Sequence, residues 1–250
     1  MEKAFVLCSG GIDSSTCAFI AWHQADDIEL VSIDYGQRHR KEIESAVKIA
    51  HALRSFNNPI QAKHSIIRLP EVLAGSGVML TNPDIAIPSI SYDQIEGVSP
   101  TYVPYRNGTM LSIVTAHAQK WVVDQITEHG KTTEQMRDST AIYFGAHAED
   151  ALNWAYPDCT PEWIGAMANA IYVGTYHTTR LITPLQWLRK CEIIDLGEQL
   201  GVPWADTWSC YAGLEKHCGV CPTCRARRRG FELAGVDDPT EYMTKEEETI

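Results

Sequence analysis

A short apolar run that ends in two glycines constrains the fold of this 250-residue chain more than any other feature. Residues 4–8 are apolar without interruption, which is typical of a strand buried on both faces of a sheet. Gly10 and Gly11 then allow a tight turn, and residues 13–25 predict a helix that Asp13 or a neighbouring serine caps. A strand, a tight turn and a helix in this order indicate a parallel α/β sheet.

The alternation of strand and helix continues along most of the chain. Further strands are predicted at 29–34, 65–69, 141–145 and 181–182, and further helices at 39–54, 106–127, 161–173 and 187–200. Residues 70–104 are rich in Pro, Gly, Ser and Asn, which predicts a long functional or mobile loop. We expect a catalytic domain at 1–206 and a cysteine-bearing module with an acidic tail at 207–250.

Composition narrows the classes of function. Hydrophobic residues make up 44% of the chain, which is enough for a sizeable core and excludes wholesale disorder. A formal net charge of −11 makes nucleic acid an improbable partner, because broad phosphate neutralisation needs the opposite sign. Neither a signal-peptide segment nor a run of 18 uncharged apolar residues is present, so we expect a cytoplasmic protein without a membrane partner.

The residues between the first strand and the first helix predict an anion-binding loop. Adjacent glycines let backbone N–H groups point at an anion, and the dipole of the following helix adds to the attraction. Hydroxyl groups supply further donors, so the proposed ATP ligands in this loop are Ser9, Gly10, Gly11, Asp13, Ser14 and Ser15. An ordinary capped turn is the alternative. The loop lacks the Gly-Lys-Ser/Thr ending of a Walker motif.

This loop resembles the Ser-Gly-Gly-x-Asp-Ser loop of the ATP pyrophosphatase (PP-loop) superfamily, whose members adenylate a substrate and release pyrophosphate. Holding the β- and γ-phosphates leaves the α-phosphorus open to a carboxylate, with Mg²⁺ sharing the charge. Asp13 is the candidate for organising the metal or the loop. Lys190 looks like the phosphate-binding lysine of these enzymes, and a solvated helix lysine is its alternative.

Four of the eight cysteines lie close together near the C-terminus. The spacing Cys210-x7-Cys218-x2-Cys221-x2-Cys224 supplies four thiolates, which predicts a closed structural zinc site. An iron–sulfur cluster and unliganded cysteines are the alternatives, and His217 is a possible competing ligand. For the arginine-rich residues 225–229 we favour a solvated helix face over a nucleic-acid patch.

Further motifs resemble one particular PP-loop family, the 7-cyano-7-deazaguanine synthase (QueC) family, over nearly the whole chain. They are Tyr35-Gly36-Gln37-Arg38-His39, Val103-Pro104-Tyr105-Arg106-Asn107, Tyr156-Pro157-Asp158-Cys159, and the cysteine block. The resemblance implies a five-stranded parallel sheet with helices on both faces, often in a homodimer. It also implies that ATP activates 7-carboxy-7-deazaguanine as an acyl-adenylate, that ammonia gives the amide, and that a second ATP gives the nitrile.

The resemblance assigns roles to single residues as well. Arg106 joins Asp13 and Lys190 as a catalytic candidate, and Gln37 and Arg38 join the ATP ligands. The implied substrate-binding residues are Arg106, Asn107, Glu149, Tyr156, Asp158 and Cys159. For Cys159, a place in the base pocket or in packing is favoured over a nucleophilic role.

Three departures from the family pattern keep other products open. Tyr105 stands where the family usually has Gly, residues 146–155 are longer than the common version, and Thr160 replaces Arg. One alternative is a sibling enzyme that stops at the amide or joins the carboxylate to another amine, such as a protein amino group. Others are a PP-loop tRNA-modifying thiolase and a zinc-knuckle RNA-binding module.

Overall fold

The computed structural model describes residues 1–55, 62–69, 73, 75, 77–91, 94 and 97–243. Within them, five parallel strands form one sheet in the order β3-β2-β1-β4-β5. The strands are β1 (Lys3–Leu7), β2 (Asp27–Asp34), β3 (Ala62–Arg68), β4 (Thr140–Tyr143) and β5 (Thr179–Ile182). The predicted α/β class and parallel sheet are confirmed.

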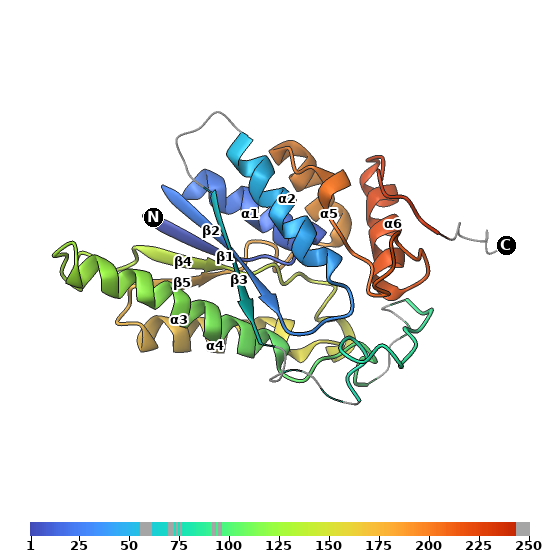
Figure 1. The fold of residues 1–250 in the computed structure, drawn as a ribbon, viewed down its shortest axis with the longest axis horizontal. Helices are drawn as coiled ribbons and strands as arrows, with labels where there is room; N and C mark the ends of the chain where they lie inside the picture. Colours follow the sequence, from blue (N-terminus) through green and yellow to red (C-terminus); the bar gives the residue numbers. More distant parts are fainter. Residues whose placement is uncertain are drawn as a thin grey trace.

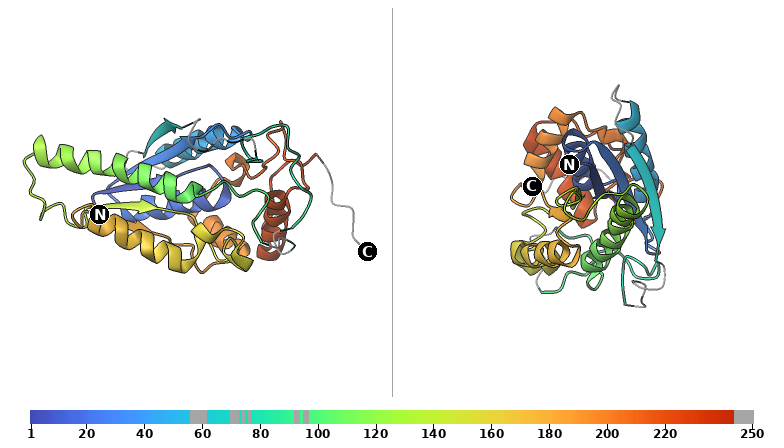
Figure 2. Two further views of the ribbon diagram at one scale, coloured as in Figure 1. Left: turned by 90° about the horizontal axis from the view of Figure 1, so that it is seen from below. Right: turned by 90° about the vertical axis from the view of Figure 1, so that its left-hand side faces the viewer.

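Helices cover both faces of the sheet (Figure 1). They are α1 (Ile12–Gln24), α2 (Lys41–Ser55), α3 (Arg106–Thr127), α4 (Pro161–Gly174), α5 (Lys190–Leu200) and α6 (Pro222–Ala234). Helices α1, α2 and α5 lie on one face, and α3 and α4 lie on the other (Figures 1 and 2). No helix among the described residues is long and apolar enough to cross a bilayer.

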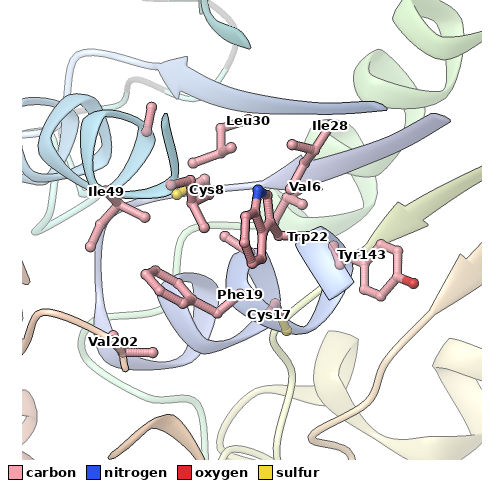
Figure 3. Close-up of a cluster of buried hydrophobic side chains, with 14 of the residues drawn as sticks. Val6, Cys8, Cys17, Phe19, Trp22, Ile28, Leu30, Ile49, Tyr143 and Val202 are labelled. Atoms are coloured by element: carbon pink, nitrogen blue, oxygen red, sulfur yellow. The ribbon is translucent and has the colours of Figure 1, made fainter. Parts of the chain in front are cut away.

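Both faces of the central strand are buried, which explains the uninterrupted apolar run. Ala4 and Val6 pack into the cluster beneath α1, whereas Phe5 packs into the cluster beneath α3. Figure 3 shows Val6 in the first cluster, beside Phe19 and Trp22 of α1. Successive side chains of a strand point to opposite faces, so a central strand with two helical layers has to be apolar at every position.

The order of the strands places a ligand-binding crevice between β1 and β4. The chain proceeds outward from β1 in one direction and from β4 in the other, and ligands bind at the carboxyl ends of strands at such a switch point. The segment after β1 is the Ser-Gly-Gly loop, and the segment after β4 contains Gly145. A Cβ at Gly145 would lie 3.1 Å from the backbone of Asp13, so the two segments are in close contact.

Local details differ from the sequence-based expectation at several points. Gly11 is the N-cap of α1 without a side-chain capping bond, so the prediction that Asp13 or a serine caps this helix was wrong. Within the described part of 70–104, Leu80 and Val103 are buried in the core beneath α3. The boundary at 206/207 stays a prediction, and Phe231 of α6 packs into the same cluster as α1.

Candidate active site

A large open cavity lies at the carboxyl ends of β1, β2 and β4. Its non-atom space, which includes solvent at the open mouth, amounts to about 1290 Å³. The residues that line it belong to the loop after β1 (residues 9–15, here called the phosphate loop), β2, α3, the segment after β4, α5 and the C-terminal segment. Residues from both halves of the sheet and from the C-terminal segment therefore meet at one cavity.

The phosphate loop has the backbone that the sequence predicts. Gly10 has φ +78°, and a Cβ there would lie 2.5 Å from the backbone nitrogen of Ala46, so the position requires glycine. Ser9 and Ser14 lie on the cavity wall with their hydroxyl oxygens 3.2 Å apart. Ser15 is fully buried, and within the described structure its hydroxyl has no hydrogen-bond partner. Of the serines in the loop, Ser9 and Ser14 are therefore the ones placed to meet a ligand.

Lys190 and Asp13, which are 177 positions apart, form an ion pair on the cavity wall. Nζ of Lys190 donates to both carboxylate oxygens of Asp13, at 2.6 and 2.8 Å. The Lys190 side chain is only 12% exposed, so it is not a solvated helix lysine. Burial raises the pKa of Asp13, but the charges of Lys190 and His147 outweigh burial and hold the pKa below its usual value. The pair brings a carboxylate and an ammonium group beside the loop.

His147 and Asp150 extend this pair into a cluster that sequence reasoning missed. Nε2 of His147 lies 3.0 Å from Nζ of Lys190 and 3.3 Å from a carboxylate oxygen of Asp150. Burial raises the pKa of Asp150, and the positive charges of His147 and Lys190 only partly offset it. The available signal was position: both residues follow β4, at the switch point of the sheet.

Most of the predicted substrate residues lie on the other side of the same cavity. Arg106, Asn107, Tyr156 and Cys159 are on its wall. Asp158 is buried behind them, where one carboxylate oxygen accepts the backbone N–H of Asn107 at 3.1 Å. Burial raises the pKa of Cys159 well above its usual value, so the group is a neutral thiol and unsuited to act as a nucleophile.

The remaining predicted ligands are placed unevenly. Gln37 lies on the cavity wall, with its amide anchored to the backbone of Ile33 and Tyr35. Arg38 points away, and its Nη1 donates to the carbonyl of Ile85 at 2.7 Å. Glu149 accepts the backbone N–H of Lys190 at 3.3 Å, so it holds the start of α5. Among the described residues, neither Arg38 nor Glu149 contributes to the cavity wall.

The departures from the family pattern have local structural explanations. Tyr105 occupies the left-handed region with φ +51°, the conformation that glycine adopts most readily. Thr160 is the N-cap of α4, where its hydroxyl accepts the N–H of Trp163. The extra residues after β4 include a single 3₁₀ turn at Leu152–Trp154.

Four cysteine sulfurs gather at the start of α6. The sulfurs of Cys210, Cys218, Cys221 and Cys224 all lie within 4.8 Å of one another. Backbone N–H groups of Ala212 and Cys218 donate to the sulfur of Cys210, at 3.4 and 3.3 Å. The close approach and the donors directed at sulfur fit four thiolates around one metal ion. Nε2 of His217 instead accepts the N–H of Ser209, so this histidine is not needed as a ligand.

The arginine-rich residues 225–229 form a solvated face only in part: Arg229 is exposed, whereas the interpretation was wrong for Arg227, which is buried. Arg227 is 1% exposed, donates hydrogen bonds to Asp238, Thr207, Ser209 and the carbonyl of Trp204, and lies over the ring of Phe231. The guanidinium of Arg228 lies over the ring of Tyr242 at 3.9 Å. These arginines hold the C-terminal segment together.

A parallel sheet in this order, with a Ser-Gly-Gly-x-Asp-Ser loop at its switch point, defines an α/β protein of the PP-loop type. The model of the family described as queuosine biosynthesis protein QueC matches residues 3–235, and the chain belongs to this family.

Curated relatives agree with this family. A protein of Thermoplasma acidophilum is 38% identical over 96% of this chain and 92% of its own length. A protein of Nitratiruptor is 39% identical over 97% of this chain and 99% of its own length, and one of Acetivibrio thermocellus is 36% identical over 98% and 100%. All three are named 7-cyano-7-deazaguanine synthase.

Proposed function

We propose that this chain converts 7-carboxy-7-deazaguanine to 7-cyano-7-deazaguanine at the expense of two ATP. The carboxylate attacks the α-phosphorus of ATP and releases pyrophosphate, and ammonia then displaces AMP to give the amide. The amide oxygen attacks a second ATP, and its loss with AMP, together with two protons from nitrogen, leaves the nitrile. The chain is thus proposed to be an ATP-dependent carbon–nitrogen ligase. The observation that carries this proposal is the Asp13–Lys190 pair beside the glycine loop, in a QueC-family chain.

The ATP end of the proposed site is the side of the cavity with the phosphate loop. Backbone N–H groups at the start of α1 and the hydroxyls of Ser9 and Ser14, which line the cavity, are proposed to hold phosphate oxygens. Lys190 is proposed to turn from Asp13 to a phosphate when ATP binds, which frees the carboxylate for the Mg²⁺ that accompanies ATP. Gln37 is proposed as a further ATP ligand.

The deazaguanine is proposed to bind near α3 and the segment that ends at Cys159. Arg106 lies on the wall and brings a partly buried positive charge, which suits the carboxylate of the substrate. Tyr156 and Cys159 supply walls for a flat ring. Asp158 lies behind this wall with one oxygen on Asn107, so its proposed role as acceptor at the ring edge requires its other oxygen to become accessible when the substrate binds.

Zinc is the proposed metal of the four cysteines, because four sulfur ligands close its tetrahedral shell. It has a structural role in this proposal, since a shell of four protein ligands leaves no position for water. The homodimer implied by the family resemblance stays a prediction.

The products of one reaction test this function. Purified protein is incubated with 7-carboxy-7-deazaguanine, ATP, Mg²⁺ and ammonium, and the mixture is analysed by mass spectrometry. We expect the nitrile with two AMP and two pyrophosphate for each molecule formed. Accumulation of the amide, or of a conjugate with another amine, would rule out the nitrile as product. Formation of ADP and phosphate would overturn the assignment of the phosphate loop.

A further inference from the structure

Helix α6 runs from the metal centre to the phosphate site. Cys221 is its N-cap, and Cys224 lies in its first turn. The helix packs closely against α5 (Figure 1). Because Lys190 is the first residue of α5, anything that shifts α6 acts directly on the start of the helix that carries this lysine.

The first contact between α6 and the phosphate site is made at Gly230. A Cβ at this position would lie 2.6 Å from Cγ of Lys190 and 2.8 Å from Cδ1 of Ile194. Real Cβ atoms essentially never approach other atoms this closely, so the stem of Lys190 lies directly on the backbone of α6. The far end of the same stem carries the Nζ that binds Asp13. The absence of a side chain at Gly230 thus allows the side chain of Lys190 to contact the backbone of α6.

The second contact is made through Arg227. Its Nη1 donates to the hydroxyl of Thr207 at 2.8 Å, and its Nη2 donates to the carbonyl of Trp204 at 3.1 Å. The guanidinium, which is fully buried, therefore clamps the segment that precedes the first cysteine. Within this segment the N–H of Trp208 donates to the carbonyl of Gly10 at 2.9 Å. Arg227 thus holds in place the segment whose Trp208 is hydrogen-bonded to Gly10 of the phosphate loop.

We propose that Arg227 and Gly230 are positioning residues through which metal at the four cysteines and ATP at the phosphate loop stabilise each other's binding. Two separate contacts connect α6 with the two parts of the site, Gly10 and Lys190. If an ordered α6 favours ATP binding, then bound ATP favours the ordered α6 and the metal to the same extent. The proposal rests on the proposed function only in requiring that the cavity binds ATP.

Gly230→Ala tests the contact with Lys190. Binding of a non-hydrolysable ATP analogue with Mg²⁺ is measured by calorimetry on metal-loaded protein. We expect the affinity for the analogue to fall about tenfold or more. The displaced lysine would no longer reach a phosphate in its proper geometry, and a misplacement of about 1 Å can cost an enzyme about 10²-fold in rate. Metal content is expected to be unchanged. Gly165→Ala is the matched control, because it makes the same exchange inside α4 with nothing within 4 Å. Affinity in Gly230→Ala equal to that of the parent would overturn the proposal.

Loss of the metal tests the reverse direction without relying on a variant. Zinc release to a chelating dye is followed with and without the ATP analogue. In the parent and in Gly165→Ala, the analogue is expected to slow release several-fold, and in Gly230→Ala this protection is expected to shrink. An analogue that binds the parent tightly yet leaves zinc release unchanged would refute the coupling.

Failure of the proposed function gives a different result. If calorimetry detects no binding of the ATP analogue to the parent protein, ATP is not the ligand and the proposed function fails. If the analogue binds and only the coupling is missing, the proposed function stands and the inference about α6 is wrong.

Discussion

Asp13 and Asp150 are two carboxylates of one cavity whose surroundings move their pKa values in opposite directions. Lys190 and His147 hold the pKa of Asp13 low, although burial alone would raise it. Burial dominates at Asp150 and raises its pKa. Ionised Asp13 therefore stabilises the native state, whereas ionised Asp150 destabilises it. A carboxylate whose charge destabilises the fold, as at Asp150, is typical of a functional site.

Asp150→Asn is expected to stabilise the protein at pH 8. A raised pKa means that stability is lost as the pH rises through the native-state pKa, so removing the charge raises Tm above that pH. We expect a gain of about 2–4 °C, the shift for about 1 kcal/mol in a chain of this size. At pH 4 the gain is expected to shrink, because the parent carboxyl is then more protonated. Thermal denaturation at both pH values measures this.

Asp13→Asn is the matched opposite of this variant. A lowered pKa gives stability that is present above the unfolded-state pKa and is lost as the pH falls through the native-state pKa. This variant should therefore lower Tm at pH 8, with a smaller effect near pH 3. If both variants shift Tm in the same direction at pH 8, the electrostatic description of the cluster is wrong.

Sequence reasoning identified the cluster only in part. Asp13 was predicted from its motif and Lys190 from its resemblance to the phosphate-binding lysine of PP-loop enzymes, although the pairing of the two residues was not predicted. His147 and Asp150 carry no spacing that distinguishes them from surface residues, and their significance comes from burial against Lys190. Arg227 was misjudged for the same reason. Its partners Thr207 and Trp204 are about 20 positions away, and no local pattern links them.

At the scale of elements, one aromatic contact joins α5 to the residues that follow it. A Cβ at Gly197 would overlap the indole ring of Trp204, so this glycine allows the ring to contact the helix backbone closely. The indole N–H also donates to Glu198 at 2.8 Å. The contact joins α5 to the segment that leads into the metal centre.

Gly197→Ala is expected to destabilise the protein by about 1–3 kcal/mol, since overpacking a buried contact shifts side chains and backbone. Glycine to alanine inside a helix otherwise stabilises by up to about 1 kcal/mol. Gly165→Ala, with open space around its Cβ, is therefore expected to be neutral or stabilising. Urea denaturation of both variants gives the comparison. Equal stabilisation of both would show that Trp204 moves freely.

Element boundaries were predicted least well where strands contain polar residues. Strand β5 begins at Thr179 rather than at Leu181, because the hydroxyl of Thr179 is bonded to Gln119 and Thr140 and can be buried in the sheet. Strand β3 begins three residues earlier than predicted. As an edge strand it tolerates Lys63 and His64, which have no place in an apolar pattern.

At the scale of the whole molecule, the metal centre and the sheet are parts of one packed structure. Phe231 of α6 lies in the core cluster of α1, and Arg227 connects α6 with the segment before the cysteines. Loss of the metal should therefore destabilise the packing of residues outside 207–235 as well. A structural zinc contributes on the order of 10 kcal/mol to forming its own site, which is comparable with the stability of a whole domain.

Cys224→Ser is expected to lower both the metal content and Tm. We expect one zinc per chain in the parent by elemental analysis and well under one in the variant, because the fully buried Cys224 supplies one of four ligands. Tm should fall by at least about 5 °C, equivalent to roughly 2 kcal/mol for a chain of this size. Cys191→Ser is the matched control, because this cysteine is partly exposed on α5, outside the cluster. A Cys224→Ser protein that keeps its zinc and its Tm would show that the four sulfurs do not form a closed site.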